Sequence, residues 1–336
     1  MDEPPSATET FRRLNQEASD WMHRGMDLLP ETSPAALEEA IRCFDRAIAL
    51  RRTLPLEENP FFRYGLSAGW INRGDAFARL GTAPALNDAV HSYDEALALL
   101  ETLPLGENPL YPRRLAIAKL NRGVALQRQS PPRDREAALM FRAALDTLAA
   151  PAAAAVEDRP LLRASALANL AGALAGLGAE AQVTESDEAY AALREALALA
   201  RPAEQSDLLH AEVALKARHA LCRLVVRDFP APRPIPHAVV AEATDAVDEA
   251  LALARQWKEK GRNDFEAMAR TFFHFGCWIY GRSLPRFLAE FLAEAPDLAA
   301  APEMAGAVAD AITAALASDS AALGTEERAA LKALAE

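Results

Sequence analysis

The stretch GWINRGDAFARLG, residues 69–81, decides the fold because its core recurs at a constant distance. The chain reads WMHRGMDLL 49 residues earlier and KLNRGVALQ 49 residues later, and one more step of that length reaches NLAGALAGLG. Four glycines are therefore evenly spaced: Gly25, Gly74, Gly123 and Gly172. A catalytic or binding loop normally occurs once, whereas a structural unit recurs at a fixed period. The spacing indicates that these glycines serve packing between helices.

A second pattern repeats with nearly the same period and predicts a helix after each of these segments. Residues 40–50 read AIRCFDRAIAL and residues 89–99 read AVHSYDEALAL, with related versions at 137–147, 189–199 and 243–253. Each has a small residue, a bulky one four later, alanine three after that and then an aliphatic one, which forms one face of an α-helix. Prolines in TLPLEENPFF (53–62) and TLPLGENPLY (102–111) predict turns between units. Ser33-Pro34 predicts a helix start and Gly81 a helix end.

These patterns predict an all-α chain of antiparallel helical hairpins with essentially no sheet. First helices are expected near 9–29, 60–80, 109–129, 159–178, 205–228 and 263–282. Second helices are expected near 34–53, 84–103, 133–149, 183–200, 237–260 and 284–294. Two alanine-rich helices, 302–318 and 325–335, are expected to end the chain.

The repeating residues resemble the signature of the tetratricopeptide repeat (TPR) family. In the unit 60–100 the resemblance is carried by Trp70, Asn72, Gly74, Phe77, Gly81, Ala89, Tyr93 and Ala96. It is good in 9–50 and in 109–147, where Lys119 stands at the tryptophan position, and weak in 159–199. In 205–253 only the second helix carries it.

The resemblance implies an α-solenoid, a right-handed superhelix in which first helices line a concave groove. Residues 9–260 would form five hairpins after a disordered N-terminus at 1–8, and 261–336 an aromatic-rich last hairpin with capping helices. The chain departs from the family in length. Its repeats measure 48 to 54 residues between Ala47, Ala96, Ala144, Ala196 and Ala250, where the family has 34.

Composition excludes several classes of protein. The net charge of −12 argues against a nucleic-acid partner, because phosphate binding needs a basic face. No apolar run approaches the roughly 18 residues of a membrane span, and the acidic N-terminus does not resemble a signal peptide, so we expect a cytoplasmic protein without a membrane partner. Cys43, Cys222 and Cys277 are expected to be buried free thiols. His274 and Cys277 lack a second ligand pair, so no metal or other cofactor is expected.

The repeated arginines Arg24, Arg73 and Arg122 allow two interpretations. They could present guanidinium groups to an acidic partner, or they could form ion pairs inside each unit, such as Arg24 with Asp45 and Arg73 with Asp94. Repetition in step with the glycines favours ion pairs. In the third unit Arg142 stands at the aspartate position, so Arg122 is expected to be free for a partner.

The predicted groove supplies the remaining candidate site residues. First-helix positions that would face a bound partner are Asn72, Asp75, Arg79, Asn121, Gln127 and Asn169, with Ile71 and Leu120 among them. The asparagines resemble those that hold a peptide backbone in TPR grooves, although plain solvation explains them equally well. The family's carboxylate clamp, which grips a C-terminal carboxylate, needs basic residues where this chain has Met22, Met26 and Ile117. That mode of recognition is therefore not expected.

The segment 257–291 is unusually aromatic and also allows two interpretations. It contains Trp257, Phe265, Phe272, Phe273, Phe275, Trp278, Tyr280, Phe287 and Phe291. These side chains could close the open end of the repeat array, or could form a homodimer interface. Because Phe272 and Phe273 are adjacent on a helix, at least one of them is expected to be exposed.

The function expected from the resemblance is a non-enzymatic scaffold that binds a protein or peptide in its groove. The alternative is a regulatory solenoid that senses a ligand or peptide, with the proline-rich loop 228–237 sealing the pocket. No phosphate-binding loop, paired-carboxylate motif or Gly-x-Ser-x-Gly element is present, so no catalytic residues are predicted. A pocket of titratable groups with shifted pKa values would favour an enzyme instead.

Overall fold

The computed structural model describes residues 7–231, 233–262, 265–318 and 323–335, and these form helices, turns and loops without a strand. The chain divides into two compact units, Met1–Leu177 and Gly178–Glu336. The predicted disorder of residues 1–8 falls mainly on 1–6, outside the described residues, while Ala7 begins the first helix. The boundary predicted at residue 260 falls within the second unit, between two helices that pack directly against each other.

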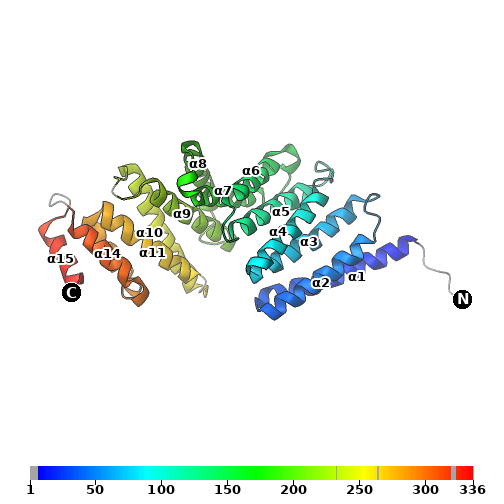
Figure 1. Ribbon diagram of the computed structural model, residues 1–336, viewed down its shortest axis with the longest axis horizontal. Helices are drawn as coiled ribbons and strands as arrows, with labels where there is room; N and C mark the ends of the chain where they lie inside the picture. The colour runs from blue at the N-terminus through cyan, green and yellow to red at the C-terminus, as the bar shows by residue number, and fades with distance from the viewer. Residues whose placement is uncertain (1–6, 232, 263–264, 319–322, 336) are drawn as a thin grey trace. The chain divides into compact units, whose positions relative to one another are not determined.

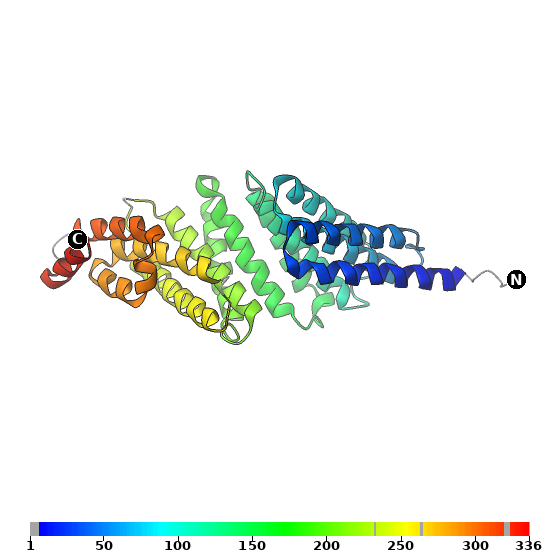
Figure 2. The same cartoon turned by 90° about the horizontal axis from the view of Figure 1, so that it is seen from below.

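The first unit consists of helical hairpins in chain order (Figure 1). Its helices are α1 (Ala7–Leu28), α2 (Pro34–Arg52), α3 (Pro60–Leu80), α4 (Ala83–Leu100), α5 (Leu110–Gln127), α6 (Asp134–Ala149) and α7 (Arg159–Gly176). The hairpin partners are α1 with α2, α3 with α4, and α5 with α6, and Figure 2 shows α1 and α2 side by side. Each second helix also packs on the next first helix, which joins the hairpins into one stack.

The helix ends follow the predicted local chemistry. The hydroxyl of Ser33 accepts a hydrogen bond from the backbone N–H of Ala36 at 3.2 Å and caps α2. Asn59 caps α3 in the same way, through the backbone N–H of Phe61 at 2.9 Å. Gly81 ends α3 with φ of 68°, a left-handed conformation that glycine adopts without strain.

Three of the four repeated glycines pack against the aromatic ring of the second helix in the same hairpin, in agreement with the predicted role in packing between helices. A Cβ added to Gly25 would lie 2.5 Å from Phe44, and one added to Gly123 would lie 2.5 Å from Phe141. The same distance from Gly74 to Tyr93 is 2.7 Å. At Gly172 the nearest atom is Nε2 of Gln127, at 3.9 Å, so the fourth glycine does not share this role.

The pairing predicted inside each unit holds for Arg24, which donates to Glu39 of its own hairpin at 3.3 Å in place of the predicted Asp45, and is wrong for Arg73 and Arg122, which reach back to the preceding hairpin. Nε of Arg73 donates to Asp45 at 2.8 Å, and Nε of Arg122 donates to Asp94 at 2.6 Å. Arg122 is therefore paired, contrary to the prediction that it is free. Each first helix packs on the second helix of the previous hairpin, which brings these side chains together. Because the carboxylates are about half exposed, each pair contributes at most about 1 kcal/mol.

The second unit contains four long helices followed by shorter ones. They are α8 (Val183–Ala200), α9 (Leu208–Asp228), α10 (His237–Glu259), α11 (Phe265–Ser283), α12 (Leu288–Glu294), α13 (Pro296–Ala299), α14 (Ala305–Leu316) and α15 (Thr325–Ala335). Consecutive helices from α8 to α11 pack on one another, and α11 also packs on α14. The predicted fourth hairpin, 159–178 with 183–200, has one helix in each unit.

Both adjacent phenylalanines of the aromatic segment are buried, which corrects the prediction that one is exposed. Phe272 and Phe273 each have 0% exposure. Their helix, α11, has neighbours on several sides, so Phe272 meets His219 of α9 while Phe273 stacks on Phe291 of α12. Most of the aromatic segment therefore forms core, although Phe287 is 45% exposed. The predicted homodimer through this region stays a prediction.

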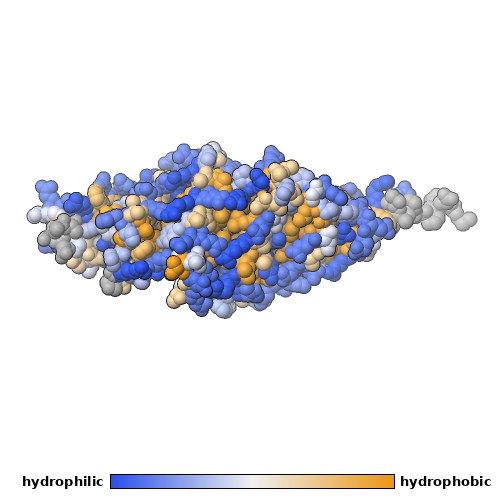
Figure 3. All heavy atoms as spheres, turned by 90° about the horizontal axis from the view of Figure 1, so that it is seen from above, coloured by the Kyte–Doolittle hydropathy of each residue, from blue (hydrophilic) through white to orange (hydrophobic). Residues whose placement is uncertain are grey.

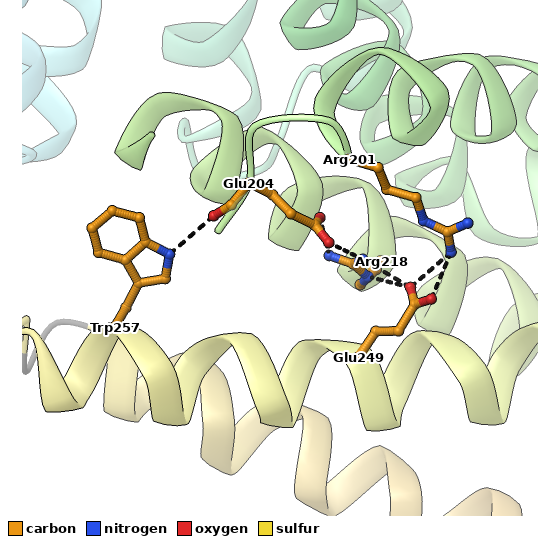
Figure 4. Close-up of polar contacts among 5 residues, drawn as sticks. All are labelled: Arg201, Glu204, Arg218, Glu249 and Trp257. Carbon is orange, nitrogen blue, oxygen red and sulfur yellow. Dashed lines mark hydrogen bonds and ion pairs between the residues drawn. The ribbon is translucent and has the colours of Figure 1, made fainter. Parts of the chain in front are cut away.

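A buried ionic network in the second unit joins the turn between α8 and α9 to α10 (Figure 4). Arg218 has 0% exposure and donates to Glu204 at 2.9 Å and to Glu249 at 2.8 Å. Arg201 also donates to Glu249 at 2.8 Å, and the indole N–H of Trp257 donates to the backbone carbonyl of Glu204. Burial alone raises the pKa of Glu249, but the hydrogen bonds from both arginines outweigh it and the net pKa is lowered.

Candidate binding groove

The first unit contains a groove of about 520 Å³, lined by α1, α3 and α5 and by the end of α2. The residues at the family's clamp positions, Met22, Met26 and Ile117, all line it, as do Ile71 and Asn72. The first helices of the three hairpins therefore share one hollow face. This groove is the candidate binding site.

Apolar side chains are exposed within this groove. Phe61 is 56% exposed and Met26 is 39% exposed, while Met22 and Ile71 form a buried floor beside them. Apolar and hydrophilic residues also alternate on the face drawn in Figure 3, so exposure of a single apolar residue carries little weight. Two large apolar side chains in one hollow, beside polar groups, are more typical of a binding site.

Two of the seven predicted site residues, Asn72 and Asp75, line the groove. The side-chain amide of Asn72 makes no hydrogen bond with any residue that the structure describes. Oδ1 of Asp75 accepts from the hydroxyl of Tyr93 at 2.6 Å and from the amide of Asn121 at 2.9 Å. Asn121 therefore links α5 to α3, whereas the amide of Asn72 makes no hydrogen bond to a described residue.

Burial raises the pKa of Asp75, although the hydrogen bonds from Tyr93 and Asn121 oppose the shift. A carboxyl with a raised pKa in the folded state binds more protons than its unfolded counterpart. Folding stability must then fall as pH rises from about 4, the unfolded value, through the folded value. The charged form of Asp75 therefore costs stability at neutral pH.

Replacing Asp75 by asparagine is expected to raise the free energy of unfolding at pH 7 by on the order of 1 kcal/mol. Oδ1 of the asparagine still accepts both hydrogen bonds, and no charge has to be buried. Urea unfolding at several pH values measures this, and the advantage of Asp75→Asn over wild type should grow as pH rises from 4 to 7. A variant less stable than wild type at pH 7 would show that the charge stabilises the fold.

The other predicted site residues contact neighbouring parts of the first unit and do not line the groove. Arg79 donates to the backbone carbonyl of Leu29 at 2.9 Å, and Arg122 pairs with Asp94 as described above. The closest polar contacts of Gln127 and Asn169 are to Asp134 at 3.3 Å and to Ser165 at 3.4 Å, respectively. The structure thus brings Asn72, Asp75 and Asn121 together, and Arg79 lies close enough to Asp75 for its charge to oppose the rise in the pKa of that carboxyl.

The sequence prediction missed Arg51 and Arg114, which also line the groove. The repeat pattern itself indicates that Arg51 is an unusual position. It stands 49 residues before Leu100, which is fully buried, so a charged residue occupies a position that the next repeat fills with core. Such a departure from the repeat marks a position where packing alone does not decide the residue.

A second hollow, of about 410 Å³, lies in the second unit against α10 and α11. Its central cation, Arg270, is already paired with Glu266 at 3.2 Å and with Glu303 at 3.3 Å. The described residues of the proline-rich loop do not line this hollow, and the loop is held to the other end of α11 by Arg282, which donates to the carbonyl of Phe229 at 2.7 Å. These contacts explain local structure, so this hollow is a weaker candidate.

The three cysteines are buried free thiols, as predicted. Burial raises the pKa of each thiol, and that of Cys277 rises to about 12, which keeps the group protonated and unreactive. Within the described part of the chain, no three His, Cys, Asp or Glu side chains are grouped so that they could hold a metal ion.

Neither the models of known protein families nor the curated proteins contain a match to this sequence. Among the described helices, none has the length and apolar character required to cross a bilayer.

Proposed function

We propose that the first unit is a divergent TPR-like solenoid that binds an extended segment of a partner protein in the groove of α1, α3 and α5. The period of 49 residues and the glycine–ring contacts within hairpins support the family assignment. The stacked hairpins provide a rigid frame, so a partner segment would bind with little ordering of the groove.

The observation that carries the proposal is that a single hollow combines exposed apolar side chains with a side-chain amide that makes no hydrogen bond to a described residue. Phe61 and Met26 expose apolar surface there, and the amide of Asn72 has no hydrogen-bond partner among the described residues. An extended peptide supplies what these groups lack. Its backbone offers donors and acceptors to the amide, and its side chains cover the apolar surface.

We propose that the groove binds its partner and does not catalyse a reaction. Asp75, Arg51 and Arg114 all line the groove with shifted pKa values, which partly meets the criterion for an enzyme. Burial is the leading cause of each shift, and no hydrogen bond or ion pair joins Asp75 to either described arginine. These groups therefore do not form a proton-transfer pair, which favours a binding site.

The proposal is tested by filling the groove. The Asn72→Trp variant places a bulky side chain in the hollow, whereas Ala98→Trp places the same side chain on an exposed position of α4. A library of octapeptides, acetylated at the N-terminus and amidated at the C-terminus, is selected on wild-type protein. Selected peptides should bind Asn72→Trp at least about tenfold more weakly and Ala98→Trp unchanged. Equal loss in both variants, or no selected peptide at all, would refute the proposal.

A further inference from the structure

Two arginines lie in the groove without an acidic partner among the described residues. Arg51 is only 8% exposed; it donates to the backbone carbonyl of Gly65 at 2.5 Å and to the hydroxyl of Ser19 at 3.2 Å. Its Nε is buried and has no hydrogen-bond partner in the part of the chain that the structure describes. Arg114 donates to the backbone carbonyl of Tyr64 at 2.8 Å, and its guanidinium lies 3.5 Å from the centre of the Tyr64 ring.

Other arginines of the same unit are paired with acids. Arg73, Arg113 and Arg122 face Asp45, Asp158 and Asp94, respectively, at 2.6 to 2.8 Å. Among the described residues, by contrast, no carboxylate lies within ion-pair distance of Arg51 or Arg114. Burial lowers the pKa of Arg114 to about 10, and the charge of Arg51 adds to the decrease. Both guanidinium groups stay protonated at neutral pH, so the groove holds one buried and one partly buried positive charge.

An unpaired buried charge is costly, and a second charge of the same sign nearby adds to the cost. An anion that enters the groove relieves both costs, and guanidinium groups bind carboxylates through paired hydrogen bonds. We infer that Arg51 and Arg114 form an acidic-side-chain subsite, which takes an aspartate or glutamate of the segment bound in the groove. This inference rests on the proposed function.

The groove also limits where the acidic side chain can lie. Arg51 contacts Gly65 and Asp75 lies ten residues further along α3, which corresponds to roughly 15 Å of helix. An extended peptide covers that distance with about four or five residues. Because both arginines lie at one end of the groove, the acid is placed at that end, with Ala68 and Ile71 between it and Asp75. These arginines are not at the positions of the family's clamp, which Met22, Met26 and Ile117 occupy.

The test uses peptides with blocked termini, so that any negative charge comes from a side chain. The octapeptide library described above should be enriched in aspartate or glutamate at one position when selected on wild-type protein. Replacing that residue by glutamine in the best peptide should weaken binding, measured by calorimetry, at least about tenfold. Arg114→Gln should weaken the acidic peptide by a similar factor and leave the glutamine peptide within about twofold of wild type.

Arg113→Gln is the matched control, because it removes the same charge from the neighbouring residue, which faces Asp158. It should bind both peptides as wild type does. Circular dichroism checks that each variant folds, and the comparison of the two peptides on wild type holds even if Arg114→Gln does not fold. Equal affinity for the acidic and glutamine peptides would overturn the subsite while leaving the proposed function intact. Preference for a phosphoserine peptide by more than about tenfold would replace carboxylate by phosphate and also overturn it. Absence of any binding peptide would refute the proposed function itself.

Discussion

Replacement of Arg218 by methionine is expected to lower the free energy of unfolding by about 3 kcal/mol. The guanidinium is completely buried and is the only described cation that donates to Glu204, whose side chain is 13% exposed. Without Arg218, that carboxylate would remain largely buried without its cation. Glu249 is affected less, because its side chain is 40% exposed and Arg201 still contacts it. Urea unfolding measures the loss, and hydrogen exchange should place it in the second unit.

Two controls separate the buried network from a general effect of losing arginine. Arg194→Met removes an exposed partner of Glu242, with 65% of the arginine side chain accessible, and should cost less than about 1 kcal/mol. Arg218→Met combined with Glu204→Gln should recover part of the loss, since no buried charge is left unpaired. Equal losses for Arg194→Met and Arg218→Met would contradict the assignment.

Lowering the pH should narrow the difference in the free energy of unfolding between Arg218→Met and wild type. The net pKa of Glu249 is lowered in the folded protein, so its contribution is complete above the unfolded pKa, about 4.3, and is lost as pH falls through the folded value. At low pH the ion pairs of Glu249 contribute less to wild type, so the free energies of unfolding of the two proteins lie closer together.

Replacement of Gly123 by alanine is expected to lower the free energy of unfolding by about 1–2 kcal/mol, although alanine is the better helix former. The added Cβ would lie 2.5 Å from the ring of Phe141, which has 0% exposure and cannot move aside without disturbing the core. The gain in helix propensity, about 1 kcal/mol, offsets only part of this overpacking. Gly25→Ala and Gly74→Ala should behave alike, because their added Cβ atoms meet Phe44 and Tyr93.

Gly172→Ala is the matched control and should have the opposite sign. The nearest atom to its added Cβ is 3.9 Å away, an ordinary contact, so the variant should gain up to about 1 kcal/mol from helix propensity. Thermal and urea unfolding of Gly123→Ala and Gly172→Ala compare two identical substitutions in the same unit. A stabilising effect in both would show that the glycine–ring contact does not constrain the hairpin. Phe141→Leu should partly rescue Gly123→Ala if the contact is the cause.

Repeat position predicts some of the residues that line the groove and not others. Asn72 lines the hollow, in keeping with a repeat position that sets which way a first-helix residue faces. Asn121 occupies a comparable position, yet its amide is used by Asp75, a contact between two different hairpins. Arg51 was missed because it enters the groove from the end of a second helix, where the repeat predicts buried core.

The amino-acid pattern alone predicts the helices, their turns and a packing role for the repeated glycines, which Gly25, Gly74 and Gly123 fulfil. Those features depend on residues close in the chain and on a period that recurs, so the pattern alone expresses them. Which charges meet, and which lack an ion-pair partner among the described residues, depends on the packing of one hairpin on the next. Arg73 and Arg122 each find an aspartate 28 residues earlier, on the preceding hairpin, while Arg51 and Arg114 find none among the described residues. Ion pairs depend on how neighbouring hairpins pack, and a periodic pattern along one chain does not specify which side chains that packing brings together.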